Sequence, residues 1–165
     1  MKIRTITETM FGGSHATASG ILLVALRVLL GLQFLVTGVS KIFSGWTAEG
    51  YLNAATGPFA DFFKAIAGST IISELNVWGL ALIGLALVIG LLVRPAAFFG
   101  ALLMVLYYFA HFVENTAFGL IDYHVIYFVL FALMASGGFG HALGIDGIIF
   151  DGTRGKKWWR FVFFG

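Results

Sequence analysis

Four long apolar stretches constrain this chain more than any other feature of its sequence. They cover residues 20–43, 75–93, 96–113 and 123–143, and the only charged residues in them are Arg27 and Lys41. A helix needs about 20 mainly apolar residues to cross the hydrocarbon core of a bilayer. Charged residues make up 11% of the chain, whereas a soluble domain has about 25%. The sequence therefore predicts an all-α integral membrane protein, a bundle of four transmembrane helices in one domain over residues 1–165.

The basic residues of the connections predict how the bundle is oriented. Seven of them fall on one side of a four-helix topology, and two, Lys41 and Lys64, fall on the other. The seven are Lys2, Arg4, Arg94, Arg154, Lys156, Lys157 and Arg160. Short loops rich in Lys and Arg stay in the cytoplasm. We therefore expect a multi-pass protein of the cell membrane with two cytoplasmic tails, residues 1–19 and 144–165, and an outer loop at residues 44–74.

The outer loop contains an amphipathic pattern. Phe59, Phe62, Phe63 and Ile66 recur at i, i+3, i+4 and i+7, which is the spacing of one helix face. The pattern predicts a short amphipathic helix on the outer membrane surface. This helix either closes the end of the bundle or acts as a lid over a site that opens outward.

One face of the first predicted helix carries both of its charges. Gly31 and Gly38 lie 4 and 11 residues after Arg27, and Lys41 lies 14 residues after it. Glycines allow a neighbouring helix to approach closely, so we expect this face to point into the bundle. An arginine at membrane depth is costly. Arg27 therefore either snorkels to the cytoplasmic headgroups or contacts an anion or a quinone carbonyl inside the bundle.

A second group of polar residues is expected at the outer ends of the third and fourth helices. His111, Glu114, Asp122 and His124 meet there because only a short loop joins the two helices. A neutral imidazole beside a carboxylate relays protons near pH 7, which suits quinone chemistry. Ordinary interfacial polar residues and axial ligation of a haem by the two histidines are the alternatives. Three tyrosines, Tyr107, Tyr108 and Tyr127, lie about one helical turn from the histidines.

The composition excludes several kinds of site. The chain has no cysteine, so disulfides, thiolate metal sites and iron–sulfur clusters are ruled out. The spacing of His, Asp and Glu matches no metal-ligand motif, so no metal is expected. A net charge of only +2 gives no reason to expect a nucleic-acid partner. Any redox work therefore needs a bound cofactor or a partner subunit.

Four stretches of the sequence carry a family likeness. The first is LRVLLGLQFLVTGVSKIF, which holds Arg27 and Lys41, and the second is GWTAEGYLNAATGPFADFF. The third is WGLALIGLALVIGLLVRPAAFFGALLM, and the fourth is DYHVIYFVLFALMASG followed by GID, with Asp122, His124 and Asp146. Together they cover roughly residues 20–147. They resemble the DoxX superfamily of small four-helix membrane proteins. Within it they look like the DoxD-like branch, which includes the membrane subunit of thiosulfate:quinone oxidoreductase, once described as a terminal quinol oxidase subunit.

The resemblance implies a membrane subunit of a quinone-linked oxidoreductase that passes electrons from a sulfur donor, such as thiosulfate, into the quinone pool. Thiosulfate would then bind near Lys41, Lys64 and the two histidines, which would also handle protons. Quinone as substrate, the lipid bilayer and a second protein subunit are the expected partners. The alternatives are a non-catalytic scaffold or assembly subunit of a respiratory or stress-defence complex, and a small-solute transporter. Whether the chain forms a homo-oligomer is left open.

Overall fold

The structure, a computed structural model, describes residues 6–136, 139 and 144–146. Within that range the regular structure is helical, as the sequence predicts. The helices are α1 (Ile6–Ser44), α2 (Glu49–Asn53), α3 (Ala60–Ala65), α4 (Thr70–Ile89), α5 (Val93–Ala110), α6 (Phe112–Asn115) and α7 (Tyr123–Ser136). The first helix is longer than predicted and continues into the residues assigned to the N-terminal tail.

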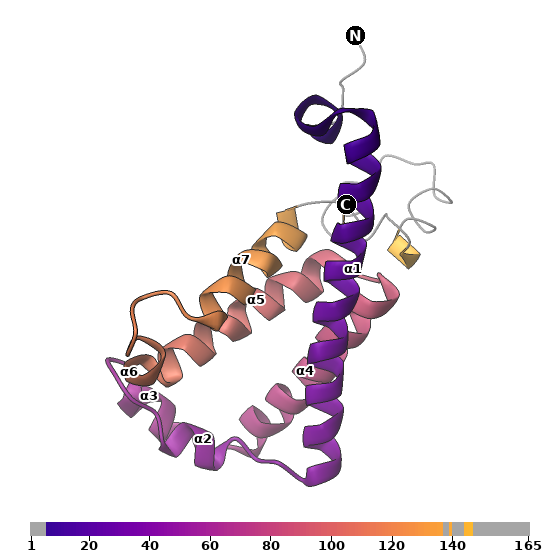
Figure 1. The fold of residues 1–165 in the computed structure, drawn as a ribbon. Coiled ribbons are helices and arrows are strands. Elements are labelled where there is room, and N and C mark those ends of the chain that lie inside the picture. The colour runs from indigo at the N-terminus through magenta and orange to yellow at the C-terminus, as the bar shows by residue number, and fades with distance from the viewer. Residues whose placement is uncertain (1–5, 137–138, 140–143, 147–165) are drawn as a thin grey trace, which may run out of the picture.

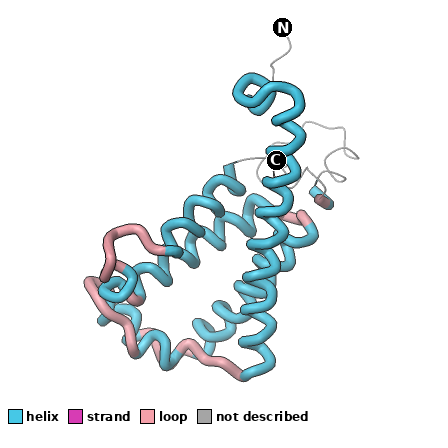
Figure 2. Tube along the Cα trace, in the orientation of Figure 1, coloured by secondary structure: helices cyan, strands magenta, loops and turns pink. Residues whose placement is uncertain are grey.

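The long helices are arranged as two pairs, α1 with α4 and α5 with α7 (Figure 1). The pairs are joined through α4 and α5, which also contact each other. The short helices α2, α3 and α6 lie together at one end of the bundle, which we call the loop end (Figure 2). The opposite end, where a tight turn joins α4 to α5, is called the turn end.

The α1–α4 pair is held close by small residues. A Cβ atom on Gly38 would overlap the backbone of Ala81 on α4, and a Cβ on Gly84 would overlap the backbone of Leu35 on α1. Side chains at these positions would push the helices apart, so the glycines set how closely they pack. The prediction that the glycine face of the first helix points into the bundle is therefore confirmed at Gly38.

A layer of fully buried apolar side chains joins the two pairs. Phe131 on α7 is fully buried and fills the space beside Gly100 on α5. Its ring lies edge-on to the ring of Phe34 on α1, with the ring centroids 5.0 Å apart. Leu87 and Val93, which flank the α4–α5 turn, are also fully buried. This core accounts for the fixed spacing of all four long helices.

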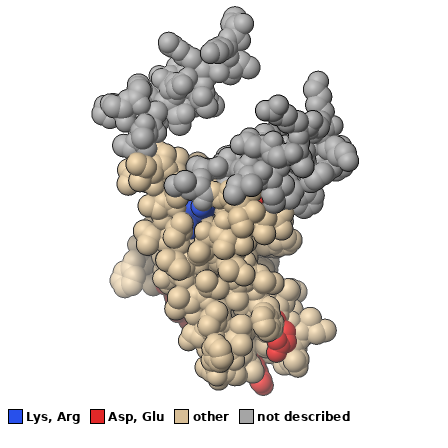
Figure 3. Space-filling model, turned by 90° about the vertical axis from the view of Figure 1, so that its right-hand side faces the viewer, with Lys and Arg blue, Asp and Glu red and all other residues tan. Residues whose placement is uncertain are grey.

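Three described helices are long and apolar enough to cross a membrane: residues 20–44 of α1, then α4 and α5. Helix α7 is equally apolar but has 14 described residues, or about 21 Å of helix. The predicted fourth span, residues 123–143, continues into residues outside the described range. Many large apolar side chains on these helices face outward, among them Leu29 (65% exposed) and Leu82 (59%). Figure 3 shows that the charges on one such face lie near its two ends, with an uncharged band between them.

The turn between α4 and α5 lies earlier than the sequence suggests. Its predicted position is Arg94–Pro95, but α4 ends at Ile89, and the next residue, Gly90, caps it in a left-handed conformation with φ of 69°. Pro95 lies in the first turn of α5, where its missing N–H costs little. The Asp146 carboxylate accepts hydrogen bonds from the N–H groups of Leu92 (2.8 Å) and Val93 (3.0 Å). This carboxylate caps α5 and so fixes where the helix begins.

The loop end has a small core of its own. Leu52 on α2, Phe63 on α3 and Ala110 at the end of α5 are buried against one another. Helix α3 occupies the predicted amphipathic stretch. Phe63 faces inward, whereas Phe59 and Phe62 are about half exposed. The loop end therefore packs onto the bundle.

Candidate functional site

A cavity of about 220 Å³ lies inside the bundle next to the loop end. All four long helices, α2 and the α1–α2 connection line it, and seven of its twelve lining residues are aromatic or histidine. They are Gln33, Phe34, Thr37, Lys41, Trp46, Tyr51, Leu80, Met104, Tyr107, Tyr123, His124 and Tyr127. We call it the aromatic cavity. It brings together four residues singled out in the sequence: Lys41, Tyr107, His124 and Tyr127.

Lys41 is fixed in this cavity by two neighbours. Its Nζ atom donates a hydrogen bond of 3.1 Å to Oδ1 of Asn76. It also lies 3.5 Å from the ring centroid of Trp46, close enough for a cation–π interaction. Because an ammonium can only donate, the Asn76 amide must present its oxygen to Lys41.

The orientation of the Asn76 amide determines whether the Tyr107 hydroxyl acts as a hydrogen-bond donor or acceptor. The amide nitrogen of Asn76 donates to the Tyr107 hydroxyl at 2.6 Å. That hydroxyl oxygen acts as the acceptor, so its own hydrogen can be donated to another group. Lys41, Asn76 and Tyr107 thus form one hydrogen-bonded chain from α1 through α4 to α5, and it leaves the Tyr107 O–H as a donor.

His124 approaches the cavity from the first turn of α7. It is only 5% exposed, and its Nδ1 lies 2.6 Å from Oδ2 of Asp122. The other carboxylate oxygen, Oδ1, accepts the backbone N–H groups of His124 and Val125. Asp122 therefore caps α7 and also accepts a hydrogen bond from Nδ1 of the imidazole ring. Nε2 is then the nitrogen available to exchange a proton. The ring centroid lies 6.1 Å from that of Tyr107.

The other predicted histidine belongs to a neighbouring cluster. His111 Nε2 lies 3.1 Å from the backbone oxygen of Tyr51, and its Nδ1 lies 3.9 Å from Glu114 Oε2. Glu114 accepts a hydrogen bond of 2.5 Å from the Thr56 hydroxyl. This bond, with a smaller contribution from the charge of His111, lowers the pKa of Glu114. The cluster organises the loop end, and neither His111 nor Glu114 lines the aromatic cavity.

Tyr51 connects the two groups. Its ring centroid lies 4.3 Å from that of His111 and 5.6 Å from that of Tyr107. Burial raises the pKa of the Tyr51 hydroxyl well above its usual range. The side chain therefore stays neutral, and it covers the loop-end side of the cavity.

Three predicted site residues lie elsewhere. Tyr108 points away from the cavity and donates to the backbone oxygen of Leu120 at 2.9 Å. Lys64 is exposed on α3. Arg27 is buried at the turn end, 1% exposed, where Nη1 donates to the backbone oxygen of Phe139 at 2.7 Å. The structure therefore does not bring Arg27, Tyr108 or Lys64 to the group around Lys41 and His124.

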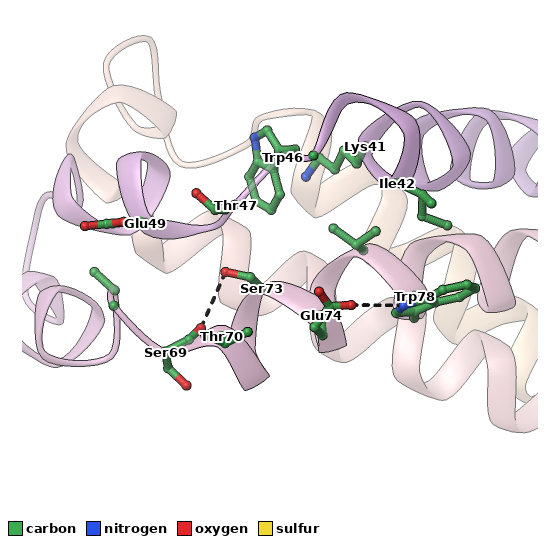
Figure 4. A pocket seen from close by; sticks show the side chains of 14 residues that line it. Lys41, Ile42, Trp46, Thr47, Glu49, Ser69, Thr70, Ser73, Glu74 and Trp78 are labelled. Carbon is green, nitrogen blue, oxygen red and sulfur yellow. Dashed lines mark hydrogen bonds between the residues drawn. The ribbon is translucent and has the colours of Figure 1, made fainter.

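A second pocket of about 290 Å³ lies on the other side of Lys41, between α1 and the start of α4 (Figure 4). Glu49 and Glu74 line it, and Glu74 accepts a hydrogen bond of 3.0 Å from the indole of Trp78. Figure 4 shows the Lys41 ammonium turned toward Trp46. With two carboxylates and one cation in its lining, this pocket is poorly suited to a dianion.

Sequence reasoning missed several cavity residues. Asn76 is a polar residue in an otherwise apolar span, and that alone is a signal of function in a membrane helix. Gln33 and Thr37 precede Lys41 by 8 and 4 residues, which places all three on one helix face. Tyr51 has no sequence signal, because it lies on the short helix α2, whose position depends on the path of the connection between α1 and α4. Among the described residues, no group of three or more His, Cys, Asp or Glu is placed to hold a metal ion.

Comparison with known proteins gives one finding. The sequence model of the DoxX family matches residues 22–112, more than half of the chain. These residues run from α1 to the start of α6 and include Lys41, Asn76 and Tyr107. No curated protein and no solved structure gives a significant match. The chain belongs to the DoxX family of membrane proteins.

Proposed function

We propose that this chain is the quinone-binding membrane subunit of an oxidoreductase, and that the aromatic cavity holds the quinone ring. The observation that carries the proposal is the placement of Tyr107 and His124 in one aromatic-lined cavity inside the bundle. Both side chains can exchange protons, and aromatic side chains favour stacking of a planar ring.

The size and lining of the cavity support a single substituted ring. An apolar cavity of about 150 Å³ accommodates benzene, and this one measures about 220 Å³. Reduction of a quinone to a quinol adds two electrons and two protons, so the ring oxygens need proton donors close by. The Tyr107 hydroxyl is one such donor, and His124 is a second at Nε2 when the ring is protonated, because both ring nitrogens then carry hydrogen and Asp122 pairs with the positive charge. Asp122 is the more exposed of the pair, with 11% of its side chain accessible against 6% for His124, so we propose that protons reach the ring through it.

The electrons must come from outside this chain. The chain has no cysteine, so we propose a partner subunit that oxidises the donor. With thiosulfate as donor, two thiosulfate ions lose one electron each and join through a new S–S bond to form tetrathionate. The two electrons then reduce one quinone, which takes up two protons. The acidic lining of the pocket beside Glu49 and Glu74 argues for oxidation of thiosulfate on the partner.

The proposed arrangement in the membrane follows from the basic residues. We propose that α7 continues as the fourth span, that both tails face the cytoplasm, and that the loop end with residues 44–74 lies outside the cell membrane. The likeness of the outer loop and the last helix to the DoxD-like branch supports the sulfur donor. In this arrangement His124 and Asp122 handle protons near the outer surface.

The test is binding of a quinone analogue to the purified full-length protein in lipid nanodiscs. Trp46 lines the cavity, so quenching of its fluorescence by decyl-ubiquinone reports binding. Tyr107→Phe and His124→Leu should each weaken binding by about tenfold, because each removes a hydrogen bond worth about 1.4 kcal/mol. Tyr108→Phe is the matched control, since its hydroxyl bonds to Leu120 outside the cavity.

Two results would count against the proposal. If the wild-type protein binds no quinone analogue, a scaffold subunit becomes the better description. If both cavity variants bind as tightly as the wild type, the quinone site lies elsewhere on the chain.

A further inference from the structure

The aromatic cavity is closed on two sides and open on a third. Toward α4 and α5 it is lined by Leu80, Met104 and Tyr107. Toward the loop end, Trp46 and Tyr51 cover it. The remaining side is the seam between α1 and α7.

The seam itself is loosely packed next to the cavity. Helices α1 and α7 meet through Phe34, whose ring centroid lies 6.3 Å from that of Tyr127 and 5.0 Å from that of Phe131. On the cavity's side of this contact, the lining residues are exposed on the membrane-facing surface. Gln33 of α1 is exposed, and Tyr123 of α7 is 60% exposed. The cavity therefore opens sideways, toward lipid.

The position of the Gln33 side chain is unfavourable unless its amide binds a ligand. It lies near the middle of the apolar span formed by residues 20–44, where an amide facing hydrocarbon is costly. Among the described residues, no side chain or backbone group forms a hydrogen bond with its amide. The nearby Thr37 hydroxyl instead donates to the backbone oxygen of Gln33 at 2.7 Å. The amide stands at the mouth of the cavity with both its donors and its acceptor available.

We infer that quinone enters sideways from the bilayer through the α1–α7 seam, and that the Gln33 amide donates a hydrogen bond to the ring oxygen on that side. This inference rests on the proposed function. The two oxygens of a p-quinone lie on opposite sides of the ring, so a firmly held ring needs donors at both. Tyr107 and His124 supply the inner donors, and Gln33 supplies the outer one. The apolar tail remains in the lipid outside the seam.

The experiment compares three variants of the full-length protein in lipid nanodiscs with decyl-ubiquinone as the probe. Gln33→Leu keeps the side-chain size but removes the amide, and Gln33→Phe fills the mouth. Leu32→Phe is the matched control, because Leu32 is the neighbouring residue, is 42% exposed to lipid and does not line the cavity. Gel filtration and the thermal midpoint establish that each variant folds.

Gln33→Leu should weaken binding by about tenfold, which is 1.4 kcal/mol, without lowering the thermal midpoint. Gln33→Phe should slow association of decyl-ubiquinone by at least about tenfold. Leu32→Phe should leave both the affinity and the association rate unchanged. The infrared spectrum of bound, carbonyl-labelled quinone provides a direct readout. One of its two C=O bands should move to higher frequency in Gln33→Leu, since that oxygen has lost a donor. A purely structural role of Gln33 would not move this band.

The failure of this inference is distinguishable from failure of the proposed function. Suppose that the wild type binds quinone and that Tyr107→Phe loses this binding. If both Gln33 variants then retain it with unchanged rates and C=O bands, the inference alone is overturned. An equal slowing of association in Leu32→Phe and Gln33→Phe also overturns it, because the effect would then not be specific to the mouth. No binding by the wild-type protein overturns both.

Discussion

At the scale of single residues, Asn76 decides how Lys41 and Tyr107 are used. The amide joins two groups that cannot hydrogen-bond each other in this arrangement, because its oxygen accepts from Lys41 and its nitrogen donates to Tyr107. Lys41 lies in a membrane-spanning helix, where an ammonium without a hydrogen-bond acceptor is costly. Asn76 is thus as important to the site as the charged residue itself.

Asn76→Leu should therefore destabilise the protein, by about 1–3 kcal/mol, since it leaves the Lys41 ammonium without its acceptor. The double variant Lys41→Met, Asn76→Leu should recover much of that loss, because both polar partners are then gone. Unfolding by SDS, followed by circular dichroism, measures these two variants and Lys41→Met alone. Additive effects of the two substitutions would show that the contact between these side chains contributes nothing to stability.

At the scale of elements, the α1–α4 contact depends on three glycines that meet the backbone of the opposite helix, Gly31, Gly38 and Gly84. A Cβ on Gly84 would overlap the backbone of Leu35, whereas a Cβ on Gly79 of the same helix meets no other atom within 4 Å. Close packing of this kind stabilises membrane helices, which gain no hydrophobic driving force from each other in lipid.

Gly84→Ala should lower stability because α1 and α4 must move apart, and it should also reduce quinone binding by displacing Lys41. Gly79→Ala is the matched control. It should be neutral or slightly stabilising, since alanine favours helix over glycine by up to about 1 kcal/mol. The SDS midpoint and the affinity for decyl-ubiquinone test both statements. Equal effects of the two substitutions would contradict the role of Gly84 in the contact.

The tether between α6 and the α2–α3 connection predicts a dependence on pH. The hydrogen bond from Thr56 lowers the pKa of Glu114 from its ordinary value of 4.5. A carboxylate whose pKa is lowered on folding stabilises the protein above its unfolded pKa, and the effect disappears as the pH falls through the folded value. Glu114→Gln should therefore lower the thermal midpoint at pH 7, and the difference from wild type should shrink as the pH falls through 4.5 and vanish once it is below the lowered pKa of Glu114. Because Glu114 is exposed, the difference should be small. A constant difference across this range would mean that the charge is not responsible.

At the scale of the whole molecule, the sequence predicts the membrane class and the helical content, because hydrophobicity over about 20 residues is a local property. The grouping of Lys41, Tyr107 and His124 follows less directly. It depends on which helices are neighbours, because these three residues come from three different helices. The sequence also suggests one polar edge containing both histidines, whereas Tyr51 and Thr56 hold His111 and Glu114 in a separate cluster. Those contacts come from the connection between α1 and α4, whose path is not encoded in a regular pattern.

The position of Arg27 shows a second limit. Its burial at membrane depth fits the expectation of an inward face, but its partner is the Phe139 backbone oxygen at the turn end. Asp146, which caps α5, lies on the same C-terminal segment. Hydrophobic patterns cannot predict such a contact, because it joins residues more than a hundred positions apart. The arginine thus belongs with the turn end of the bundle, and the lysine of the same helix belongs with the aromatic cavity.

The topology of the whole chain can be tested by reporter fusions. Seven basic residues against two predict that both tails and the α4–α5 turn face the cytoplasm. Fusions after Gly13, near Pro95 and at Gly165 should therefore report cytoplasm, and fusions near Gly57 or Asn115 should report the outside.

The fusion at Gly165 decides whether α7 is a full span, since 14 described residues are too few to cross the hydrocarbon without continuing. An outside signal at Gly165 together with a cytoplasmic one near Pro95 would mean that the chain crosses the membrane three times. His124 and Asp122 would still lie near the outer surface, but the C-terminal segment could not then reach Arg27 and α5 at the turn end. The contacts of Phe139 with Arg27 and of Asp146 with Leu92 and Val93 therefore favour a chain that returns to the cytoplasmic side.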